Sequence, residues 1–385
     1  MSEQDNQYLF KILKSAISDD FSVQQTTNTY TEEMLHESIE ISKKHDLLHL
    51  LVCGLEKHGI KTDEQNLTKH LLTAVYRYEQ INYTLAMICE ALENAEISFI
   101  PLKGAVMRKY YPEPWMRTSC DIDILVHEED ADRAALYLVN NCGFIYQGKS
   151  QHDISMYSPN KNHLELHYDL LEDNYANKSP EILKSVWTTA ITRDGKEYWH
   201  EMPDEMFYFY HIAHMAKHFE EGGCGIKPFI DLWILDKLNK DNHKKRDELL
   251  EQGELLTFAN AVRKLSKIWL GNEEHDAVSL QIERYILHGG VYGTMDNRVS
   301  IQQQKNGGKF KYICSRIFMP YDELKYKYPI IQKHKIMTPI IQLRRWCNLL
   351  KPSALKRSLH EAKINSNISK NEMDNVQVFL NDIGL

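Results

Sequence analysis

The sequence Arg117-Thr-Ser-Cys-Asp-Ile-Asp-Ile-Leu-Val126 decides the fold of this chain, because it predicts a buried strand that carries two carboxylates. Alternate side chains of a strand share a face, so Asp121 and Asp123 project to one side while Ile122 and Ile124 enter the core. Two carboxylates a few ångströms apart repel each other by about 1 to 4 kcal/mol, depending on the local dielectric. A cation is therefore expected between them. Mg²⁺ suits this position because it prefers hard oxygen ligands and binds proteins through one or two carboxylates.

A pair of acids at this spacing also occurs by chance, and a solvated strand edge is the alternative explanation. The preceding sequence favours the metal site. Pro101-Leu-Lys-Gly-Ala105 predicts a strand that ends at Gly104, where a helix begins and its backbone N–H groups can meet an anion. Arg117 offers a bidentate donor for phosphate oxygens, and Ser119 offers a hydroxyl.

A third acid lies on a later strand. In His163-Leu-Glu-Leu-His167, apolar and polar residues alternate, so Glu165 and His167 are expected on one face of the strand. A merely exposed strand carboxylate is the alternative for Glu165.

Helices are predicted on both sides of these strands. They cover residues 31–57 and 67–95 before the strands, and most of the chain beyond residue 203. Between them, strands over residues 97–102, 120–126, 144–147, 153–158 and 163–170 alternate with helices over residues 104–111 and 128–141. Two glycine pairs, at 289–290 and 307–308, predict hinges around a loop.

This order of elements predicts an α+β fold with a small mixed sheet. We expect three regions: a helical N-terminal region (residues 1–95), an α/β domain (residues 96–200) and a helical C-terminal domain with a basic tail (residues 201–385).

A stripe of polar residues follows on a predicted helix. His211, His214 and His218 recur at spacings of three and four residues, with Lys217 beside them. A zinc site is poorly supported, because the helix has no H-E-x-x-H motif and no cysteine partner. We expect the helix to line a cleft, with Lys217 or a histidine near phosphate and Asp231 orienting it. Ordinary helix-packing histidines are the alternative.

The composition is that of a globular protein. The chain has 385 residues, of which 43% are hydrophobic and 26% charged, which is sufficient for two or three domains with cores. No segment reaches the roughly 18 apolar residues of a membrane span, and the start does not read as a signal peptide. The seven cysteines include no C-x-x-C pair. We therefore expect a cytoplasmic protein with reduced cysteines.

The charge is unevenly distributed. Residues 305–357 contain thirteen lysines and arginines but only two acids, so this segment carries +11 and the remainder −19. A polyanion partner, whether a triphosphate, nucleic acid or phospholipid, is one explanation, and a solvated basic surface is the other. The aromatic residues of this tail are expected in the core of a helical domain, with base stacking as the alternative.

These motifs together resemble the nucleotidyltransferases of the DNA polymerase beta superfamily, whose pattern is a strand, a Gly-Ser turn into a helix, a D-x-D or D-x-E strand and a third acid on a later strand. More narrowly, the chain is similar to the uncharacterised bacterial family usually labelled nucleotidyltransferase family 5. The resemblance rests on Leu102-Lys-Gly, Tyr111-Pro, Arg117-Thr-Ser-Cys-Asp121-Ile-Asp123, Gly143-Phe144 and Glu165-Leu-His167. It continues through less specific motifs at residues 214–218, 231–232, 318–320, 328–329 and 339–345, and so extends over nearly the whole chain after residue 90.

The resemblance implies a magnesium-dependent enzyme that transfers a nucleoside monophosphate from an NTP, with ATP as the expected donor. Asp121, Asp123 and Glu165 would be the catalytic and metal-binding residues, with Mn²⁺ as an alternative to Mg²⁺. Glu165 would also accept the proton of the attacking hydroxyl. The residues expected to bind the nucleotide are Lys103, Gly104, Arg117, Ser119, His167, His214, Lys217, His218 and Asp231.

One departure from the superfamily pattern concerns the triphosphate. Ala105 stands where the superfamily usually has serine after the glycine, so Lys103 or Ser119 would have to replace that hydroxyl. The missing hydroxyl leaves a non-catalytic nucleotide-binding module as one alternative function. A toxin-like or regulatory nucleotidyltransferase that modifies tRNA or protein is another. The sequence leaves open whether the acceptor is a small molecule, tRNA or protein, and it does not indicate the oligomeric state.

Overall fold

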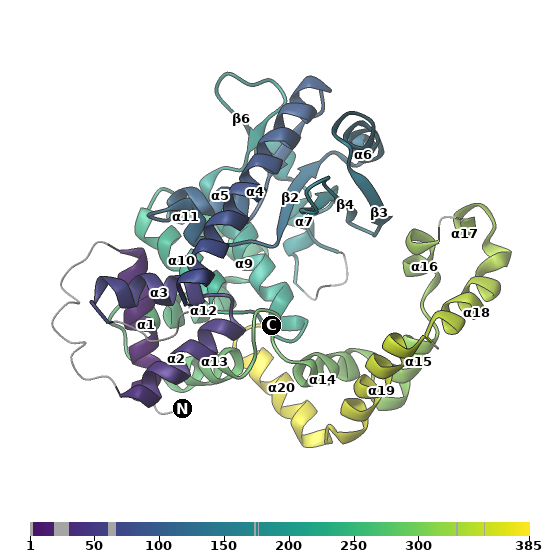
Figure 1. Ribbon diagram of the computed structural model, residues 1–385. Helices are drawn as coiled ribbons and strands as arrows, with labels where there is room; N and C mark the ends of the chain where they lie inside the picture. The colour runs from purple at the N-terminus through teal and green to yellow at the C-terminus, as the bar shows by residue number, and fades with distance from the viewer. Residues whose placement is uncertain are drawn as a thin grey trace.

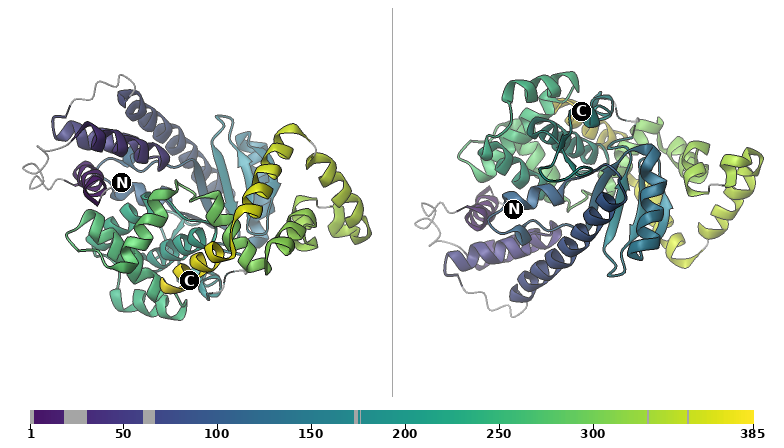
Figure 2. Two further views of the ribbon diagram at one scale, coloured as in Figure 1. Left: turned by 90° about the horizontal axis from the view of Figure 1, so that it is seen from below. Right: turned by 90° about the horizontal axis from the view of Figure 1, so that it is seen from above.

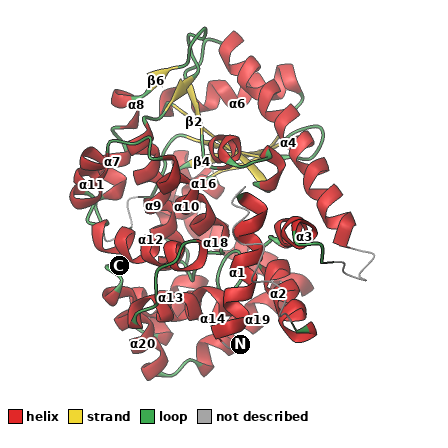
Figure 3. Ribbon diagram, turned by 90° about the vertical axis from the view of Figure 1, so that its left-hand side faces the viewer, coloured by secondary structure: helices red, strands yellow, loops and turns green. Residues whose placement is uncertain are grey.

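The computed structural model describes residues 3–18, 31–60, 67–172, 175, 177–328, 330–349 and 351–385. This part of the chain is mostly helical and contains one five-stranded sheet and one two-stranded sheet (Figure 3). The strands are β1 (Phe99–Pro101), β2 (Asp121–Val126), β3 (Ile145–Lys149), β4 (Asp153–Tyr157), β5 (His163–His167), β6 (Ile191–Thr192) and β7 (His200–Glu201).

Helices precede, interrupt and follow the sheet. The first group is α1 (Glu3–Ile17), α2 (Glu32–Lys44), α3 (Leu48–Lys57) and α4 (Leu67–Asn94). The sheet region contains α5 (Gly104–Met107), η2 (Arg108–Tyr110), η3 (Pro114–Met116), α6 (Glu128–Cys142), α7 (Ser179–Leu183) and α8 (Val186–Thr189). The helices after it are α9 (Asp204–Glu220), α10 (Lys227–Leu238), α11 (His243–Gln252), α12 (Leu256–Leu270), α13 (Ala277–His288) and α14 (Met295–Asn306).

The larger sheet is mixed, as predicted. Its strand order is β1-β2-β5-β4-β3, in which β2 and β5 are parallel and every other neighbouring pair is antiparallel. The alternation of β2 buries Ile122 and Ile124, which pack in one core with side chains of α4 and α6 (Figure 1). The carboxylates of β2 therefore lie on the opposite face of the sheet.

That opposite face meets a second core, which the helices from both ends of the chain share. Leu125 of β2 packs in the same cluster as Leu9 of α1, Leu50 of α3 and Phe209 of α9. The first and last helical regions thus enclose the sheet together, and the division of the chain at residues 95 and 200 stays a prediction.

Two details of the predicted elements are wrong. The single helix over residues 31–57 is divided into α2 and α3 by a turn in which Asp46 adopts a φ of 54°. The Asp46 carboxylate accepts hydrogen bonds from Thr118 and Lys227, so contacts distant in sequence stabilise this turn. The segment between the two glycine pairs is not only a loop, because it contains α14 with Thr294 as its N-cap.

The C-terminal helices form an arm that projects from the body of the molecule and returns to it (Figures 1 and 2). Its helix α16 contacts β3, and α19 and α20 pack against α14. The predicted burial of its aromatic residues is confirmed only in part, since Tyr312 is buried whereas Phe310 and Phe318 are exposed. The arm consists of α15 (Lys309–Ile317), α16 (Tyr321–Lys327), α17 (Ile330–Lys333), η4 (Lys335–Met337), α18 (Thr338–Leu349), α19 (Pro352–Asn367) and α20 (Lys370–Asp382).

Among the described residues, no helix has both the length and the apolar character needed to cross a membrane.

Candidate active site

The parallel pair β2 and β5 brings the predicted acids together. Asp123 is directly opposite Glu165, and Asp121 is opposite His163. Because side chains two residues apart on a strand share a face, Asp121, Asp123 and Glu165 all project from the face opposite the α4 and α6 core. Asp123 is 3% exposed, whereas Asp121 and Glu165 are half-buried.

One group of potential metal ligands forms at this position. Asp123, Glu165 and His167 offer ligand atoms that all lie within 4.8 Å of one another. His167 Nε2 lies 2.9 Å from Asp123 Oδ1 and 3.4 Å from Glu165 Oε2. This group contains two of the three predicted metal ligands and has His167, rather than Asp121, as its third member.

Lys103 contributes a second positive group. Its Nζ donates a hydrogen bond of 2.8 Å to Asp123 Oδ1, while the Leu102 backbone N–H donates to the Asp123 carbonyl. The backbone of Lys103 has φ 43° and ψ −114°, outside the conformations that residues other than glycine usually adopt. Such strain is maintained by surrounding structure and is concentrated at functional sites.

The pKa values of these groups reflect strong mutual interactions. Burial alone would raise the pKa of Asp123, but the Lys103 charge and the His167 hydrogen bond hold it well below its usual range. The His167 hydrogen bond lowers the pKa of Glu165 against the effect of its burial. Burial and the neighbouring Asp123 raise the pKa of Asp121. Burial would lower the pKa of His167, yet its hydrogen bonds to Asp123 and Glu165 raise it above its ordinary value. The Lys103 charge and the His167 hydrogen bonds therefore stabilise the ionised carboxylates.

The donor set fits a divalent cation. Carboxylate oxygens are the ligands that Mg²⁺ and Mn²⁺ prefer, and an imidazole nitrogen is better suited to Zn²⁺ and other later transition metals. Asp121 lies two residues from Asp123 on the same face and adds a third carboxylate. A cation bound here would compete with Lys103 and His167 for the oxygens of Asp123.

Ser119 lies against Gly104. A Cβ atom added to Gly104 would be 3.2 Å from Ser119 Cβ and 3.4 Å from Ser119 Oγ, so the absence of a side chain allows this approach. Arg108 donates hydrogen bonds to Ser119 Oγ (3.0 Å) and to the Gly104 carbonyl (2.8 Å). The serine oxygen is thus occupied as an acceptor, which leaves its own O–H to donate elsewhere.

Arg108 is a buried cation that the sequence interpretation missed. It is 6% exposed, and its Nη1 has no hydrogen-bond partner among the described residues. Burial and the charge of Arg117 lower its pKa to about 10. A buried cation of this kind is costly unless an anion compensates it.

Arg117 is bound to Asp231. Its Nε and Nη2 donate to both oxygens of Asp231 at 2.7–2.9 Å, and its Nη1 donates to the Thr118 carbonyl. Tyr111 donates to the same carboxylate at 2.7 Å. Because Asp231 is fully buried, this arrangement anchors the segment before β2 to α10. Asp231 therefore contacts Arg117 and Tyr111. We predicted that Asp231 orients Lys217 or a histidine, and its hydrogen bonds to the described residues include neither.

The polar stripe of α9 faces the same region. His214 and His218 are stacked edge to face with ring centroids 4.4 Å apart. Burial and the charges of Lys103 and Lys217 lower the pKa of both histidines, in the case of His218 to about 4. His211 instead contacts the Pro228 carbonyl, with its Nε2 at 2.9 Å. None of these histidines belongs to the metal-ligand group found among the described residues.

Two aromatic residues near the carboxylates were also missed. Tyr210 is buried, and the charges of Lys103, Asp123 and Glu165 act on its hydroxyl group. Extension of the α9 stripe by one turn toward the N-terminus would have included it, since Tyr210 precedes His214 by four residues. Tyr292 comes from a glycine-rich loop 74 residues after His218, and no local pattern links it to the site.

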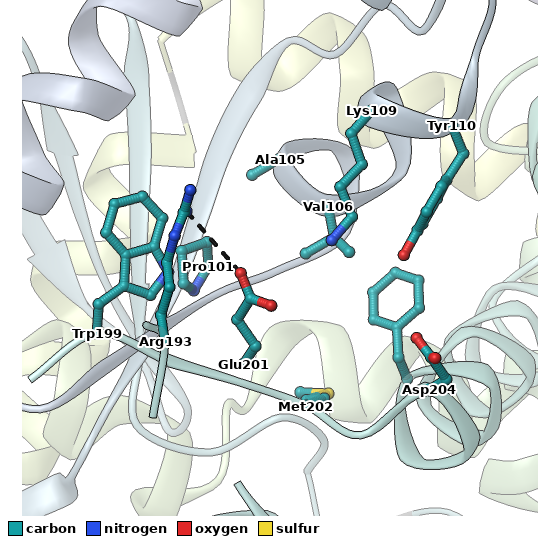
Figure 4. A pocket seen from close by; sticks show the side chains of 11 residues that line it. Pro101, Ala105, Val106, Lys109, Tyr110, Arg193, Trp199, Glu201, Met202 and Asp204 are labelled. Carbon is teal, nitrogen blue, oxygen red and sulfur yellow. Dashed lines mark ion pairs between the residues drawn. The ribbon is translucent and has the colours of Figure 1, made fainter. Parts of the chain in front are cut away.

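Two cavities lie near the motif without including the carboxylates. One, of about 110 Å³, lies between β1, α5 and the β6–β7 hairpin and is lined by Ala105, Lys109, Arg193 and Trp199 among others (Figure 4). The other, of about 260 Å³, is lined by Asp46, His49, Arg77 and Thr118 among others. The side chain of residue 105 therefore lines the first cavity, whereas Ser119 lies over Gly104.

Comparison with known proteins supports the resemblance seen in the sequence. A family described as an uncharacterised nucleotidyltransferase has a model that matches residues 32–271. This range runs from α2 to the end of α12, so it includes the sheet and every carboxylate of the site, and it ends before the arm. Searches of curated proteins and of solved structures gave no match.

Proposed function

The chain belongs to the uncharacterised nucleotidyltransferase family, and on this premise we propose that it transfers a nucleoside monophosphate from an NTP to an acceptor. The expected donor is ATP, and the accepting group is a hydroxyl or phosphate. The observation that carries the proposal is the position of Asp123 opposite Glu165 on parallel strands, with Asp121 on the same face.

Asp121, Asp123 and Glu165 would hold Mg²⁺ or Mn²⁺. When bound, the cation would neutralise the triphosphate and the charge that develops during phosphoryl-type transfer. We propose that His167 holds Asp123 and Glu165 in position through the contacts at 2.9 and 3.4 Å. The imidazole would then be a positioning group as well as a candidate ligand.

The nucleotide would lie above the carboxylates, where the chain offers Lys103 and Ser119 as donors. Lys103 lies 2.8 Å from Asp123, so its charge is available to phosphate oxygens that approach the carboxylates. Ser119 would donate its free O–H to the triphosphate and replace the hydroxyl missing at Ala105. Arg117 and Asp231 would act indirectly, because their pairing fixes the segment that carries Ser119 and Asp121.

The reaction requires little from the protein beyond position and charge. The acceptor oxygen forms a bond to the α-phosphorus, the bond from that phosphorus to the bridging oxygen breaks, and pyrophosphate leaves. Glu165 is the expected acceptor of the hydroxyl proton, because its lowered pKa keeps it ionised at neutral pH.

Incubation of the protein with NTPs labelled at the α-phosphate, Mg²⁺ and cell extract tests this proposal. The label should enter an acceptor in an amount equal to the pyrophosphate released. Asp123→Asn and Glu165→Gln should abolish nearly all transfer, whereas Asp132→Asn, a control at an exposed carboxylate of α6, should retain it. Full activity of either site variant would refute the assignment.

A non-catalytic nucleotide-binding module is the second candidate. It is supported by the Lys103 ammonium group and the His167 ring, which already contact Asp123 Oδ1. Calorimetry that detects NTP binding without turnover on small molecules, tRNA or protein would favour this candidate. Growth arrest on expression that Asp123→Ala relieves would instead favour a toxin-like enzyme.

A further inference from the structure

Four aromatic rings form a continuous row beside the carboxylates. Tyr210, His214 and His218 lie one turn apart on α9, with centroid distances of 6.1 Å and 4.4 Å between successive rings. Tyr292, from the loop between α13 and α14, extends the row, with its ring 6.4 Å from that of His218.

The row runs from the interior to the surface. Tyr210 is 2% exposed, and Tyr292 is 70% exposed. Tyr210 packs in the same core as Leu125, which shares a face of β2 with Asp123, so the inner end of the row lies on the carboxylate side of the sheet. At the outer end, burial raises the pKa of Tyr292, and the charge of Asp121 raises it further. The row thus extends from the carboxylate side of the sheet to solvent.

Backbone contacts hold the exposed end of the row. A Cβ atom at Gly293, where φ is 69°, would lie 1.9 Å from the Gly222 carbonyl oxygen, so the two loops touch. On the other side of the tyrosine, the Val291 N–H donates to the Lys44 carbonyl at 3.3 Å. Tyr292 is therefore presented to solvent from a loop attached at both of its neighbouring positions.

The two histidines in the middle are uncharged at neutral pH. Burial and the charges of Lys103 and Lys217 hold the pKa of His214 well below its ordinary value and that of His218 at about 4. Neutral rings present apolar faces, and a flat heteroaromatic ring gains by stacking on such faces.

We propose that this row is the binding surface for the nucleobase of the donor NTP, with Tyr292 and His218 as the rings on which the base stacks. The inference rests on the proposed function in one respect, namely that the ligand is a nucleoside triphosphate. A nucleotide whose triphosphate lies at Lys103 and Ser119 would place its base along this row. Because stacking uses the face of a ring, the surface accepts any base and favours the larger purines.

Binding measurements can separate the base from the phosphates. Isothermal titration calorimetry with Mn²⁺ should compare a non-hydrolysable ATP analogue with inorganic tripolyphosphate, which lacks the base. Tyr292→Ala should weaken binding of the analogue about tenfold, in keeping with the loss of one stacked base, and leave tripolyphosphate unchanged. Tyr292→Phe should retain wild-type affinity, because it keeps the ring.

Tyr83→Ala is the matched control, since Tyr83 is 65% exposed on α4. It should change neither affinity. Equal weakening of both ligands by Tyr292→Ala, or no change in either, would overturn the proposed surface, as would a wild-type protein that binds the analogue no better than tripolyphosphate. A wild-type protein that prefers the analogue but transfers nothing would defeat the proposed function and leave the stacking surface intact.

Discussion

Asp123 and Glu165 lie directly opposite each other on β2 and β5. His167 lies two residues after Glu165 on the same face of β5 and contacts both carboxylates. This relationship concentrates negative charge on one side of the sheet, where Lys103 and His167 both contact Asp123 Oδ1. Loss of the Lys103 charge should therefore affect metal binding and nucleotide binding differently.

Lys103→Met should separate these two properties. The substitution removes a cation that lies 2.8 Å from Asp123 Oδ1 and so competes with a metal for that oxygen. We expect Mn²⁺ affinity to be maintained or increased, and NTP affinity to fall about tenfold as a charge facing the phosphates is lost. Calorimetry of both ligands tests this, with Lys109→Met, in the cavity of Figure 4, as the control. Loss of Mn²⁺ binding in Lys103→Met would contradict it.

Ser119→Ala should lower the affinity of the enzyme for its NTP. Removal of a hydroxyl that donates to a charged phosphate costs about 1.5 to 3 kcal/mol, so KM for the NTP should rise at least about tenfold. Adding Ala105→Ser should not restore it, because residue 105 lines the separate cavity of Figure 4. Steady-state kinetics on the single and double variants provide the measurement. An unchanged KM in Ser119→Ala, or its recovery on addition of Ala105→Ser, would rule out this role of the serine.

The buried pair of Arg117 and Asp231 should be strongly coupled. Replacement of one partner leaves an uncompensated charge in the interior, so Arg117→Met and Asp231→Leu should each cost about 3 to 5 kcal/mol in the free energy of unfolding. The double variant should lose much less than the sum of the two, since it leaves neither charge. Urea unfolding of all four proteins gives the coupling energy. Additive losses would show that the pair does not act as a unit.

Buried His45 should make the protein less stable in mild acid. Both of its ring nitrogens lack a hydrogen-bond partner among the described residues, and burial, with the charge of Lys44, lowers its pKa from 6.5 to about 4. The unfolded chain binds a proton first as the pH falls, so the contribution of His45 to stability is constant above pH 6.5 and declines between 6.5 and about 4. The loss is on the order of 3 kcal/mol for this one group.

His45→Leu should reduce that decline, because leucine does not titrate. Thermal unfolding between pH 7 and 4 is the measurement, and the same substitution at exposed His360 should leave the pH dependence as in the wild type. An equally steep decline in His45→Leu would assign the acid sensitivity to other groups.

Local patterns were sufficient to predict the strands that carry the acids. Alternation with a period of two placed Ile122 in the core and Asp123 on the other face, and the structure has both there. The same reasoning put Glu165 and His167 together, because their side-chain directions depend on one strand only. Prediction succeeded where a single element determines the outcome.

Contacts between distant segments could not be predicted in this way. Arg117 was interpreted as a phosphate ligand, whereas its guanidinium is bound to Asp231, 114 residues away. The break between α2 and α3 depends on Asp46, whose carboxylate is held by Lys227 of α10. Arg108 and Tyr292 carry no motif, and only the packed structure shows their position. Their importance comes from partners that sequence spacing does not indicate.

A crystal structure with Mn²⁺ and a non-hydrolysable NTP tests the central claim most directly. We predict an anomalous difference peak within coordination distance of the Asp123 and Glu165 oxygens, with the triphosphate bound to the same ion and Asp121 beside it. A peak elsewhere, for example at the cavity lined by Lys109 and Arg193, or a triphosphate bound with Lys103 and His167 still holding Asp123 and no ion present, would contradict the metal site.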